Sequence, residues 1–313
     1  MVVEFPIGST GLKVHAVSDV SVDIREGETL GLVGESGCGK TTTGRAMMQV
    51  PPPTSGNEDI RDVRSKMQMI FQDPTSSLNP RRTIREIVAE PLVIQWLESL
   101  GRSKVSVRDV LSTVGLDPDV AMDKRPHEFS GGQAQRICIA RALTLDPKIL
   151  ICDEPVSALD VSVQAQILNL LESMKKTYGL TMVFISHDLA VVKNISDRVA
   201  VMYLGKICEI ARPDELYFNP AHPYSAALIS SIPVPDPLID QSLIEAVEGE
   251  LPSPIAPPSG CRFRTRCPRA TEKCTDEEPQ IRQVGEEHFV ACHFPLVDAE
   301  PIAATSDGEM ASA

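Results

Sequence analysis

The sequence lacks any long apolar run, and it has little positive charge. Nowhere do about 18 apolar residues follow one another, so no membrane-spanning helix is expected. The N-terminus has no basic stretch followed by an apolar core, so no signal peptide is expected either. The 30 lysines and arginines stand against 43 acidic residues, and the net charge of −13 disfavours a large footprint on nucleic acid. We expect a soluble protein that stays in the cytoplasm and does not have nucleic acid as its main partner.

The chain is long enough for one large domain and a small one. Its 313 residues are 42% hydrophobic, which can fill a substantial core, and no internal repeat is apparent. Short apolar segments alternate with helical ones, which predicts a parallel sheet in an α/β fold. The predicted strands span residues 14–24, 29–33, 67–71, 148–152, 180–185 and 199–203. The predicted helices span residues 42–50, 130–145 and 161–178, and residues 84–116 have a broken helical periodicity.

The composition changes after residue 230. Residues 231–259 are rich in proline, which predicts a linker with little regular structure. Residues 260–295 contain four cysteines and form a predicted C-terminal module. Residues 296–313 are small and acidic, so we expect a disordered tail.

A glycine-rich loop follows the predicted strand 29–33 and precedes a predicted helix. It matches the phosphate-binding pattern G-x-x-x-x-G-K-[ST] with Gly34, Glu35, Ser36, Gly37, Cys38, Gly39, Lys40 and Thr41, and Thr42 follows. Glycines let backbone N–H groups turn toward the phosphates of ATP, Lys40 reaches the β/γ oxygens, and Thr41 supplies a hydroxyl to Mg²⁺. A glycine turn with an incidental Lys-Thr pair is the alternative, and the strand and helix around the loop argue against it. The thiol of Cys38 has no expected role.

Two carboxylates end the apolar strand that runs up to Cys152. Such a strand brings Asp153 to Mg²⁺ and places Glu154 to polarise the water that attacks the γ-phosphate. Two acids that merely close a surface strand are common for this pattern alone. Beside a phosphate-binding loop, that alternative loses most of its weight.

A second glycine-rich patch lies far from the phosphate loop. Phe129-Ser130-Gly131-Gly132-Gln133 stands between that loop and the acidic strand end. An enzyme that closes its own nucleotide pocket has no use for such a patch. We infer that the ATP site is shared, so that each chain supplies one half of a site to a partner.

Together these segments resemble the ATP-binding-cassette (ABC) ATPases, and the resemblance covers residues 1–230. It implies a P-loop NTPase fold with a RecA-like core, a small antiparallel β subdomain and a helical subdomain at about residues 75–145, followed here by the cysteine-rich extension. Ser130 to Gln133 match the family signature, which contacts the γ-phosphate of ATP held by the opposite subunit. Phe129 replaces the usual leucine, a change between apolar side chains.

Three further positions match motifs of the same family. Gln72 matches the Q-loop glutamine, which couples Mg²⁺ and the water to the membrane partner, Asp160 lies in the D-loop, and His187 matches the switch histidine. A lone glutamine or histidine is more often structural, but five motifs in the family order make coincidence negligible. The resemblance thus implies catalytic roles for Glu154, His187, Gln72 and Lys40, and Mg²⁺ binding by Thr41, Gln72 and Asp153.

A finer resemblance is to the ATPase subunits of peptide and nickel importers. It rests on residues 71–81, 155–164, 222–224 and 260–268 and extends the match to about residue 294. It implies an ATP-hydrolysing subunit that powers import of oligopeptides, dipeptides or a related solute such as nickel. The implied partners are two permease subunits, a second and related cassette, and indirectly an extracytoplasmic solute-binding protein. The chain would then be peripheral on the cytoplasmic face of the membrane. His222-Pro223-Tyr224 is given no catalytic role.

The family also stacks an aromatic side chain on adenine, upstream of the phosphate loop. Only Phe5 is available, with His15 as the fallback, and a core position for Phe5 is the alternative. The interval 56–71 is shorter than the family usually has, so we expect a trimmed antiparallel subdomain.

The C-terminal cysteines are Cys261, Cys267, Cys274 and Cys292. In a reducing compartment they indicate a metal rather than disulfides. Tight C-x₂₋₄-C knuckles, usual for structural zinc, are absent, and thiolates from irregular loops suit an iron–sulfur cluster; zinc and reduced thiols stay open. Some peptide-importer ATPases that this chain resembles have a [4Fe–4S] cluster in this region, which favours the cluster.

Two other classes compete with an importer subunit. A soluble ABC ATPase that acts on DNA or ribosomes is disfavoured, because the chain has neither a long coiled-coil insertion before the signature nor a second cassette. A non-catalytic regulatory cassette is disfavoured by the intact Glu154, His187 and Ser130.

Overall fold

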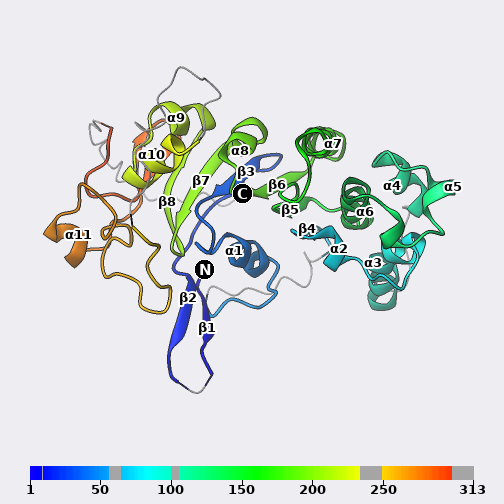
Figure 1. Cartoon of the computed structure of the whole chain (residues 1–313), viewed down its shortest axis with the longest axis horizontal. Helices are drawn as coiled ribbons and strands as arrows, with labels where there is room; N and C mark the ends of the chain where they lie inside the picture. Colours follow the sequence, from blue (N-terminus) through cyan, green and yellow to red (C-terminus); the bar gives the residue numbers. More distant parts are fainter. Residues whose placement is uncertain (9, 56–64, 100–105, 233–248, 298–313) are drawn as a thin grey trace, which may run out of the picture. The chain divides into compact units, whose positions relative to one another are not determined.

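The computed structural model describes residues 1–8, 10–55, 65–99, 106–232 and 249–297. The chain divides into two compact units. The first comprises Met1–Ile207 and Leu251–Pro257, and the second comprises Cys208–Glu250 and Pro258–Ala313. Figure 1 shows the elements of each.

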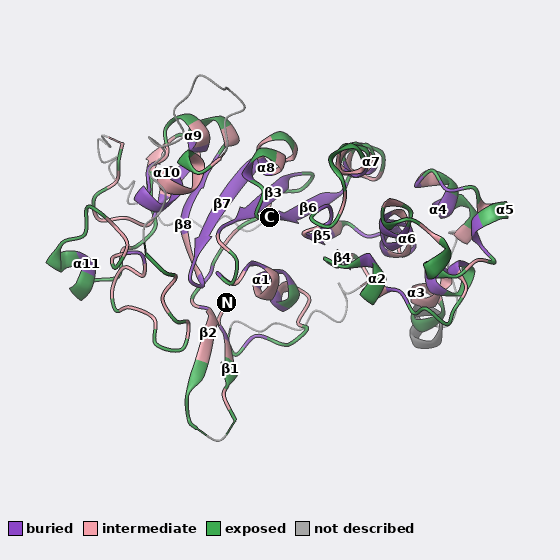
Figure 2. Ribbon diagram, viewed as in Figure 1, coloured by how far each residue is buried: buried purple, intermediate pink, exposed green. Residues whose placement is uncertain are grey.

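The first unit is built on a parallel sheet, as the alternating strands and helices predict. Its strands pair in the order β4-β5-β6-β3-β7. Their bounds are β3 Thr29–Val33, β4 Met67–Ile70, β5 Ile149–Asp153, β6 Thr181–Ile185 and β7 Arg198–Tyr203. The central strands are buried along their whole length, as expected for a parallel sheet covered on both faces (Figure 2).

Helices connect these strands. They are α1 Lys40–Met47, α7 Val161–Tyr178 and α8 Leu189–Ile195. Helix α1 packs against β5 and β6, and α8 packs against β3. The bounds of α7 confirm the predicted helix, whereas α1 begins two residues before the predicted residue 42.

A group of helices lies between β4 and β5 in the sequence, where the helical subdomain was expected. They are α2 Pro74–Ser77, α3 Ile84–Ser99, α4 Val107–Thr113, α5 Pro118–Ala121, the 3₁₀ turn η1 Pro126–Glu128 and α6 Gly131–Leu143. Helix α6 is the centre of the group, because it packs against α2, α3, α4 and α7. Its side chains Ile137, Cys138 and Ile139 are fully buried.

Strands β1 (Val3–Pro6) and β2 (Lys13–Val17) form an antiparallel pair. The predicted strand 14–24 is wrong beyond Val17, because Asp19 adopts a left-handed backbone conformation with φ 55°. The backbone N–H groups on either side of Asp19 do not continue the pairing with β1. Ser18 N–H donates to Gly205 O, and Val20 N–H donates to Met1 O. Of the interval that looked trimmed, residues 56–64 lie outside the described residues.

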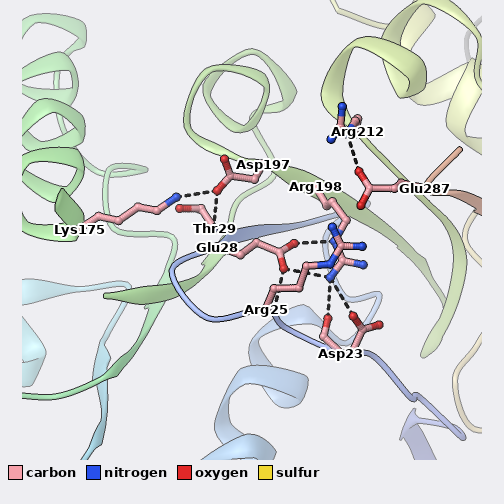
Figure 3. Close-up of polar contacts among 9 residues, drawn as sticks. All are labelled: Asp23, Arg25, Glu28, Thr29, Lys175, Asp197, Arg198, Arg212 and Glu287. Atoms are coloured by element: carbon pink, nitrogen blue, oxygen red, sulfur yellow. Dashed lines mark hydrogen bonds and ion pairs between the residues drawn. The ribbon is translucent and has the colours of Figure 1, made fainter. Parts of the chain in front are cut away.

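Polar side chains join the N-terminal ends of β3 and β7 (Figure 3). The guanidinium of Arg198 donates to both carboxylate oxygens of Glu28, at 2.6 and 3.0 Å, and both side chains are buried. Asp197 accepts from the Thr29 backbone N–H at 2.7 Å and from Lys175 Nζ at 2.6 Å. The strand that leads into the phosphate loop is thus fixed at its far end to β7 and α7.

The second unit has three antiparallel strands in the order β8-β10-β9. Its elements are β8 Lys206–Ala211, α9 Pro213–Phe218, α10 Pro223–Ser230, α11 Glu272–Asp276, β9 Arg282–Gly285 and β10 His288–Val290. The rings of Tyr224 and Phe263 pack at 5.3 Å between centroids in its core. Residues 249–259 of the predicted linker contain no helix or strand, while residues 233–248 and 298–313, most of the predicted tail, lie outside the described residues.

The buried carboxylate of Glu209 holds this unit together. It accepts hydrogen bonds from the backbone N–H groups of Ala221 and His222, at 2.7 and 2.8 Å, and lies 2.6 Å from Nε2 of His288. The ring of His222 caps α10, because its Nδ1 accepts from Tyr224 N–H at 3.0 Å. The His-Pro-Tyr segment therefore begins a helix.

Candidate nucleotide-binding and hydrolysis site

The phosphate loop connects β3 to α1, and two of its glycines are required by space and by φ. Gly34 has φ 151° and Gly39 has φ 105°. A Cβ atom on Gly34 would stand 2.1 Å from Met202 O, and one on Gly39 would stand 2.2 Å from Ala16 O. No other residue fits either position. Because glycine has no side chain, the backbone N–H groups of the loop stay accessible at these two positions.

Lys40 and Cys38 are the buried side chains of this loop. The Lys40 ammonium donates to Gly34 O at 2.8 Å and to Glu35 O at 3.0 Å, so it points back into the loop. Phosphate oxygens of a nucleotide are stronger acceptors for the same donors. Burial raises the pKa of Cys38 and keeps its thiol protonated at neutral pH.

Thr41 and Asp153 meet at the C-terminal end of β5. Thr41 Oγ1 donates to Asp153 Oδ1 at 2.8 Å. The Asp153 carboxylate is buried, its other oxygen Oδ2 has no hydrogen-bond partner in the part of the chain that the structure describes, and burial raises its pKa. A hydroxyl and an unpaired carboxylate oxygen are ligands that fit Mg²⁺.

Two side chains that are distant in the sequence converge on one carboxylate oxygen of Glu154. Glu154 Oε2 accepts a hydrogen bond from Gln72 Nε2 at 3.0 Å and lies 3.2 Å from Nδ1 of His187. Glu154 itself has φ 48°, a left-handed conformation that is unfavourable for a residue with a side chain. Its N–H donates to Ile185 O at 3.0 Å, which fixes the first residue after β5 to β6.

The signature residues begin helix α6. Ser130 is its N-cap, and a capping box joins Ser130 N–H to Gln133 Oε1 at 3.0 Å and Gln133 N–H to Ser130 Oγ at 3.4 Å. Ser130, Gly131 and Gln133 are exposed. The predicted helix start at Ser130 is confirmed, and the helix N-terminus is open to a ligand or a partner.

Asp160 caps helix α7. Its carboxylate accepts from Ser162 Oγ at 2.7 Å and from Val163 N–H at 3.0 Å, and the hydroxyl of Ser162 is the main cause of its lowered pKa. Asp160 is the last residue of the segment 154–160, which connects β5 to α7 and begins with Glu154. The D-loop and the proposed base therefore belong to the same connection.

Phe5 and His15 lie on the β1-β2 pair. Phe5 is 37% exposed, so its alternative placement in the core is wrong. His15 lies beside Ala16, whose carbonyl faces Gly39 of the phosphate loop, and its Nδ1 is 2.9 Å from Glu4 Oε1. Both side chains remain candidates to stack on adenine.

An open groove runs beside Gln72. Its polar lining includes Gln72 and Asp73 of the Q-loop segment together with Arg45 and Arg141. Phe71 also lines it and is 38% exposed. Arg141 donates to Ser77 O, which fixes α6 to the helix that follows Gln72.

The four C-terminal cysteines line one small cavity of the second unit, Cys261, Cys267, Cys274 and Cys292. Burial raises the pKa of Cys261 and Cys267, and it raises that of Cys292 to about 11. Among the described residues, no group of three or more His, Cys, Asp or Glu side chains is arranged to hold a metal ion. The thiols thus share a cavity without forming a metal site, and the expected cluster is not supported by their arrangement.

Sequence reasoning missed two polar side chains of the segment after Glu154. Ser157 Oγ donates to Glu154 O at 3.1 Å, and Gln164 Nε2 donates to Val156 O and Leu159 O at 3.1 and 3.0 Å. The available signal was the position of Gln164, four residues after the N-cap Asp160, where a side chain faces the preceding turn.

No helix in the described residues is long and apolar enough to cross a membrane.

Comparison with known proteins agrees with this geometry. Residues 17–157 match the ABC transporter family, and residues 208–274 match the oligopeptide/dipeptide transporter C-terminal region. The chain is 53% identical over 296 residues to the putative oligopeptide transport ATP-binding protein YkfD of Bacillus subtilis, covering 90% of each chain. It is 53% identical over 295 residues to the oligopeptide transport ATP-binding protein OppF of Salmonella typhimurium, covering 89% of this chain and 87% of OppF.

Solved structures give the same fold. The dimeric, post-hydrolysis ATP-binding cassette MJ0796 bound to ADP and Pi superposes with a TM-score of 0.58 at 27% identity, covering 68% of this chain and 96% of that chain. The cassette cbiO1 of Clostridium perfringens, part of an ABC transporter complex, also has a TM-score of 0.58 at 27% identity, covering 69% of this chain and 88% of its own.

Proposed function

Because this chain belongs to the ABC transporter family, among the oligopeptide transport ATP-binding proteins, we propose that it hydrolyses ATP to power import of oligopeptides through membrane permeases. The observation that carries the proposal is the convergence of Gln72 and His187 on Glu154, beside the Thr41–Asp153 pair. Nothing favours a soluble ATPase that acts on nucleic acid or ribosomes.

Each side chain of this centre has a task in hydrolysis. Lys40 and the loop N–H groups bind the phosphates, and Thr41, Asp153 and Gln72 would hold Mg²⁺, which supplies charge neutralisation at the phosphates when bound. Glu154 is the group that would accept a proton from the attacking water, and the hydrogen bond that its carboxylate accepts from Gln72 at 3.0 Å orients it. His187, 58% exposed and beside the same oxygen, orients the water and the γ-phosphate.

The signature is proposed to serve the ATP of a second cassette. The exposed N-terminus of α6 supports this, because it offers Ser130 and its N–H groups outward. Asp160 and its neighbours would lie at the same interface. We propose a related but different subunit as the partner cassette.

Two permease subunits are the proposed membrane partners, and a solute-binding protein would deliver the cargo to them. The groove beside Gln72 supports docking of their cytoplasmic helices, since it combines exposed Phe71 with polar and basic side chains. The chain would then be peripheral on the cytoplasmic face of the membrane. A stable pool of free protein, unchanged when the permease genes are deleted, would contradict this location.

The cysteine-rich part of the second unit is proposed to bind a [4Fe–4S] cluster. The proposal rests on the resemblance to cluster-containing importers; Cys261, Cys267, Cys274 and Cys292 line one cavity but form no metal site as they are arranged, so they would have to move to bind the cluster. Buried thiols lose their protons only when a metal compensates the negative charge, so binding requires rearrangement and proton release. The cluster would supply structure by tying loops of the unit together.

Transport by the reconstituted complex tests the function. The chain, a related cassette and both permeases are placed in proteoliposomes with the binding protein, and uptake of a labelled oligopeptide is compared with uptake of nickel. Peptide uptake that requires ATP, and that stops with Glu154→Gln in this chain, is the expected result. Uptake of nickel without uptake of peptide would show that nickel is the cargo. ATP turnover stimulated by nucleic acid without permeases would overturn the proposed function.

A further inference from the structure

The turn between β5 and α7 begins with Glu154 and ends with Asp160, and the side chain of Gln164 holds it. Gln164 Nε2 donates to Val156 O at 3.1 Å and to Leu159 O at 3.0 Å. Both neighbours are carbonyl acceptors, so only the NH₂ end of the amide satisfies them, and both of its hydrogens are used. We propose that Gln164 is a positioning residue for ATP hydrolysis, which acts by fixing this turn and thereby the carboxylate of Glu154.

The turn needs such a restraint, because Glu154 is in an unfavourable left-handed conformation with φ 48°. Glu154 O accepts from Ser157 N–H at 3.3 Å and Ser157 Oγ at 3.1 Å, and Val156 O accepts from Leu159 N–H at 3.2 Å. These are local bonds within a turn whose residues Pro155 and Val156 are buried and whose residues Ser157, Ala158 and Asp160 are exposed. Gln164 connects the turn to α7, an 18-residue helix with a buried face.

The turn and the first residues of α7 both lie against the signature glycines. A Cβ atom on Gly131 would stand 3.5 Å from Leu159 Cδ2, and one on Gly132 would stand 2.5 Å from Val163 Cγ1. The carbonyl of that same Leu159 is held by Gln164. Gln164 therefore restrains both the turn that follows Glu154 and Leu159, the residue nearest to Gly131 of the signature.

Because Gln164 acts through Glu154, the proposal rests on the ATPase function proposed above. Three variants of the full chain test it. Gln164→Glu keeps the length of the side chain and removes its donors, Gln164→Lys keeps N–H donors at a similar reach, and Gln166→Glu is the control. Gln166 lies on the same helix, is exposed, and contacts Arg136 Nη2 at 3.3 Å instead of the turn.

Steady-state ATP turnover and thermal unfolding are measured for each. We expect Gln164→Glu to lower kcat by about 10- to 100-fold with the KM for ATP changed less than about twofold, as for a misplaced catalytic group. Gln166→Glu should retain the wild-type kcat, and Gln164→Lys should recover part of the loss. Gln164→Glu should also lower the Tm, because its carboxylate would face the carbonyl oxygens of Val156 and Leu159, so kcat is measured at a temperature where every variant is folded.

Three results would overturn the proposal. These are a kcat of Gln164→Glu equal to that of Gln166→Glu, a loss that appears only in the KM for ATP, or a Gln164→Lys variant that is no more active than Gln164→Glu. A wild-type chain without ATP turnover above that of Glu154→Gln is a different outcome, because it would overturn the ATPase function itself and the positioning role with it.

Discussion

Gln72 Nε2 donates a 3.0 Å hydrogen bond to Glu154 Oε2 across 82 positions of the sequence. Gln72 also lines the open groove, so one side chain touches both the proposed base and the proposed docking surface. A movement of the groove that draws Gln72 away changes the contacts of the carboxylate directly. If permeases dock at the groove as proposed, this contact would connect transport to hydrolysis physically.

Glu154→Gln should leave ATP binding intact and lower turnover by at least about 10²-fold, because the amide cannot accept the proton of the attacking water. Dimers that enclose ATP should accumulate with ATP and Mg²⁺, and gel filtration detects them. Turnover near the wild-type rate would show that another residue is the base.

Arg198→Met should lower the free energy of unfolding by about 3 to 5 kcal/mol, since it leaves the buried Glu28 carboxylate without its guanidinium partner and with the Arg25 N–H as a remaining donor. Denaturant unfolding measures the loss. Lys176→Ala is the control, because its ion pair with Glu172 is exposed and should matter by less than about 0.5 kcal/mol. Equal effects of the two changes would mean that the buried pair adds nothing to stability.

His222 should make the second unit sensitive to acid. Burial lowers its pKa from 6.5 to about 4, so the unfolded chain binds the proton more readily between these values. Stability is complete above pH 6.5 and is lost as the pH falls to about 4, by about 1.4 kcal/mol per pH unit.

Hydrogen exchange of the α10 amides, corrected for intrinsic rates, measures this loss. His222→Asn keeps a side-chain acceptor for the cap and removes the titration, so its protection should change much less over the same range. An identical pH dependence in both proteins would assign the effect to other groups.

Protein purified without oxygen should be brown, with broad absorption near about 400 nm that Cys267→Ser abolishes. Cys208→Ser is the matched control, because Cys208 is also a buried thiol of the second unit but does not line the cysteine cavity. Colourless protein with one zinc per chain would show that the cysteines bind zinc in place of the cluster. Folded, metal-free protein would show that the cysteines form no metal site.

Local patterns were sufficient to predict the parallel strands β3 to β7, the helices α6 and α7, and the strand and helix on either side of the phosphate loop. Apolar strands such as residues 180–185 and the cap at Ser130 are set by nearby residues, and so they can be read from the sequence. The end of β2 could not be predicted from the sequence, because it depends on Asp19 adopting φ 55° and on backbone hydrogen bonds to Gly205 and Met1.

The site followed the same division. The motifs predicted a set of candidate residues, but the shared contact of Gln72 and His187 with one oxygen of Glu154 depends on tertiary structure. The pair Glu28–Arg198 spans 170 positions and has no local pattern at all. Gln164 binds within a few residues, yet its acceptors are backbone carbonyls, which composition does not reveal.

The shared ATP site is tested most directly by comparing ATP affinity in monomers of Ser130→Arg and Lys40→Ala. Ser130→Arg removes a cap worth about 1 kcal/mol, so folding is first checked by its Tm. The account predicts wild-type ATP affinity for Ser130→Arg, a strong loss for Lys40→Ala, and no hydrolysis at the composite site that Ser130→Arg completes. Equal loss of monomer affinity in the two variants would place Ser130 in its own nucleotide pocket and contradict the shared site.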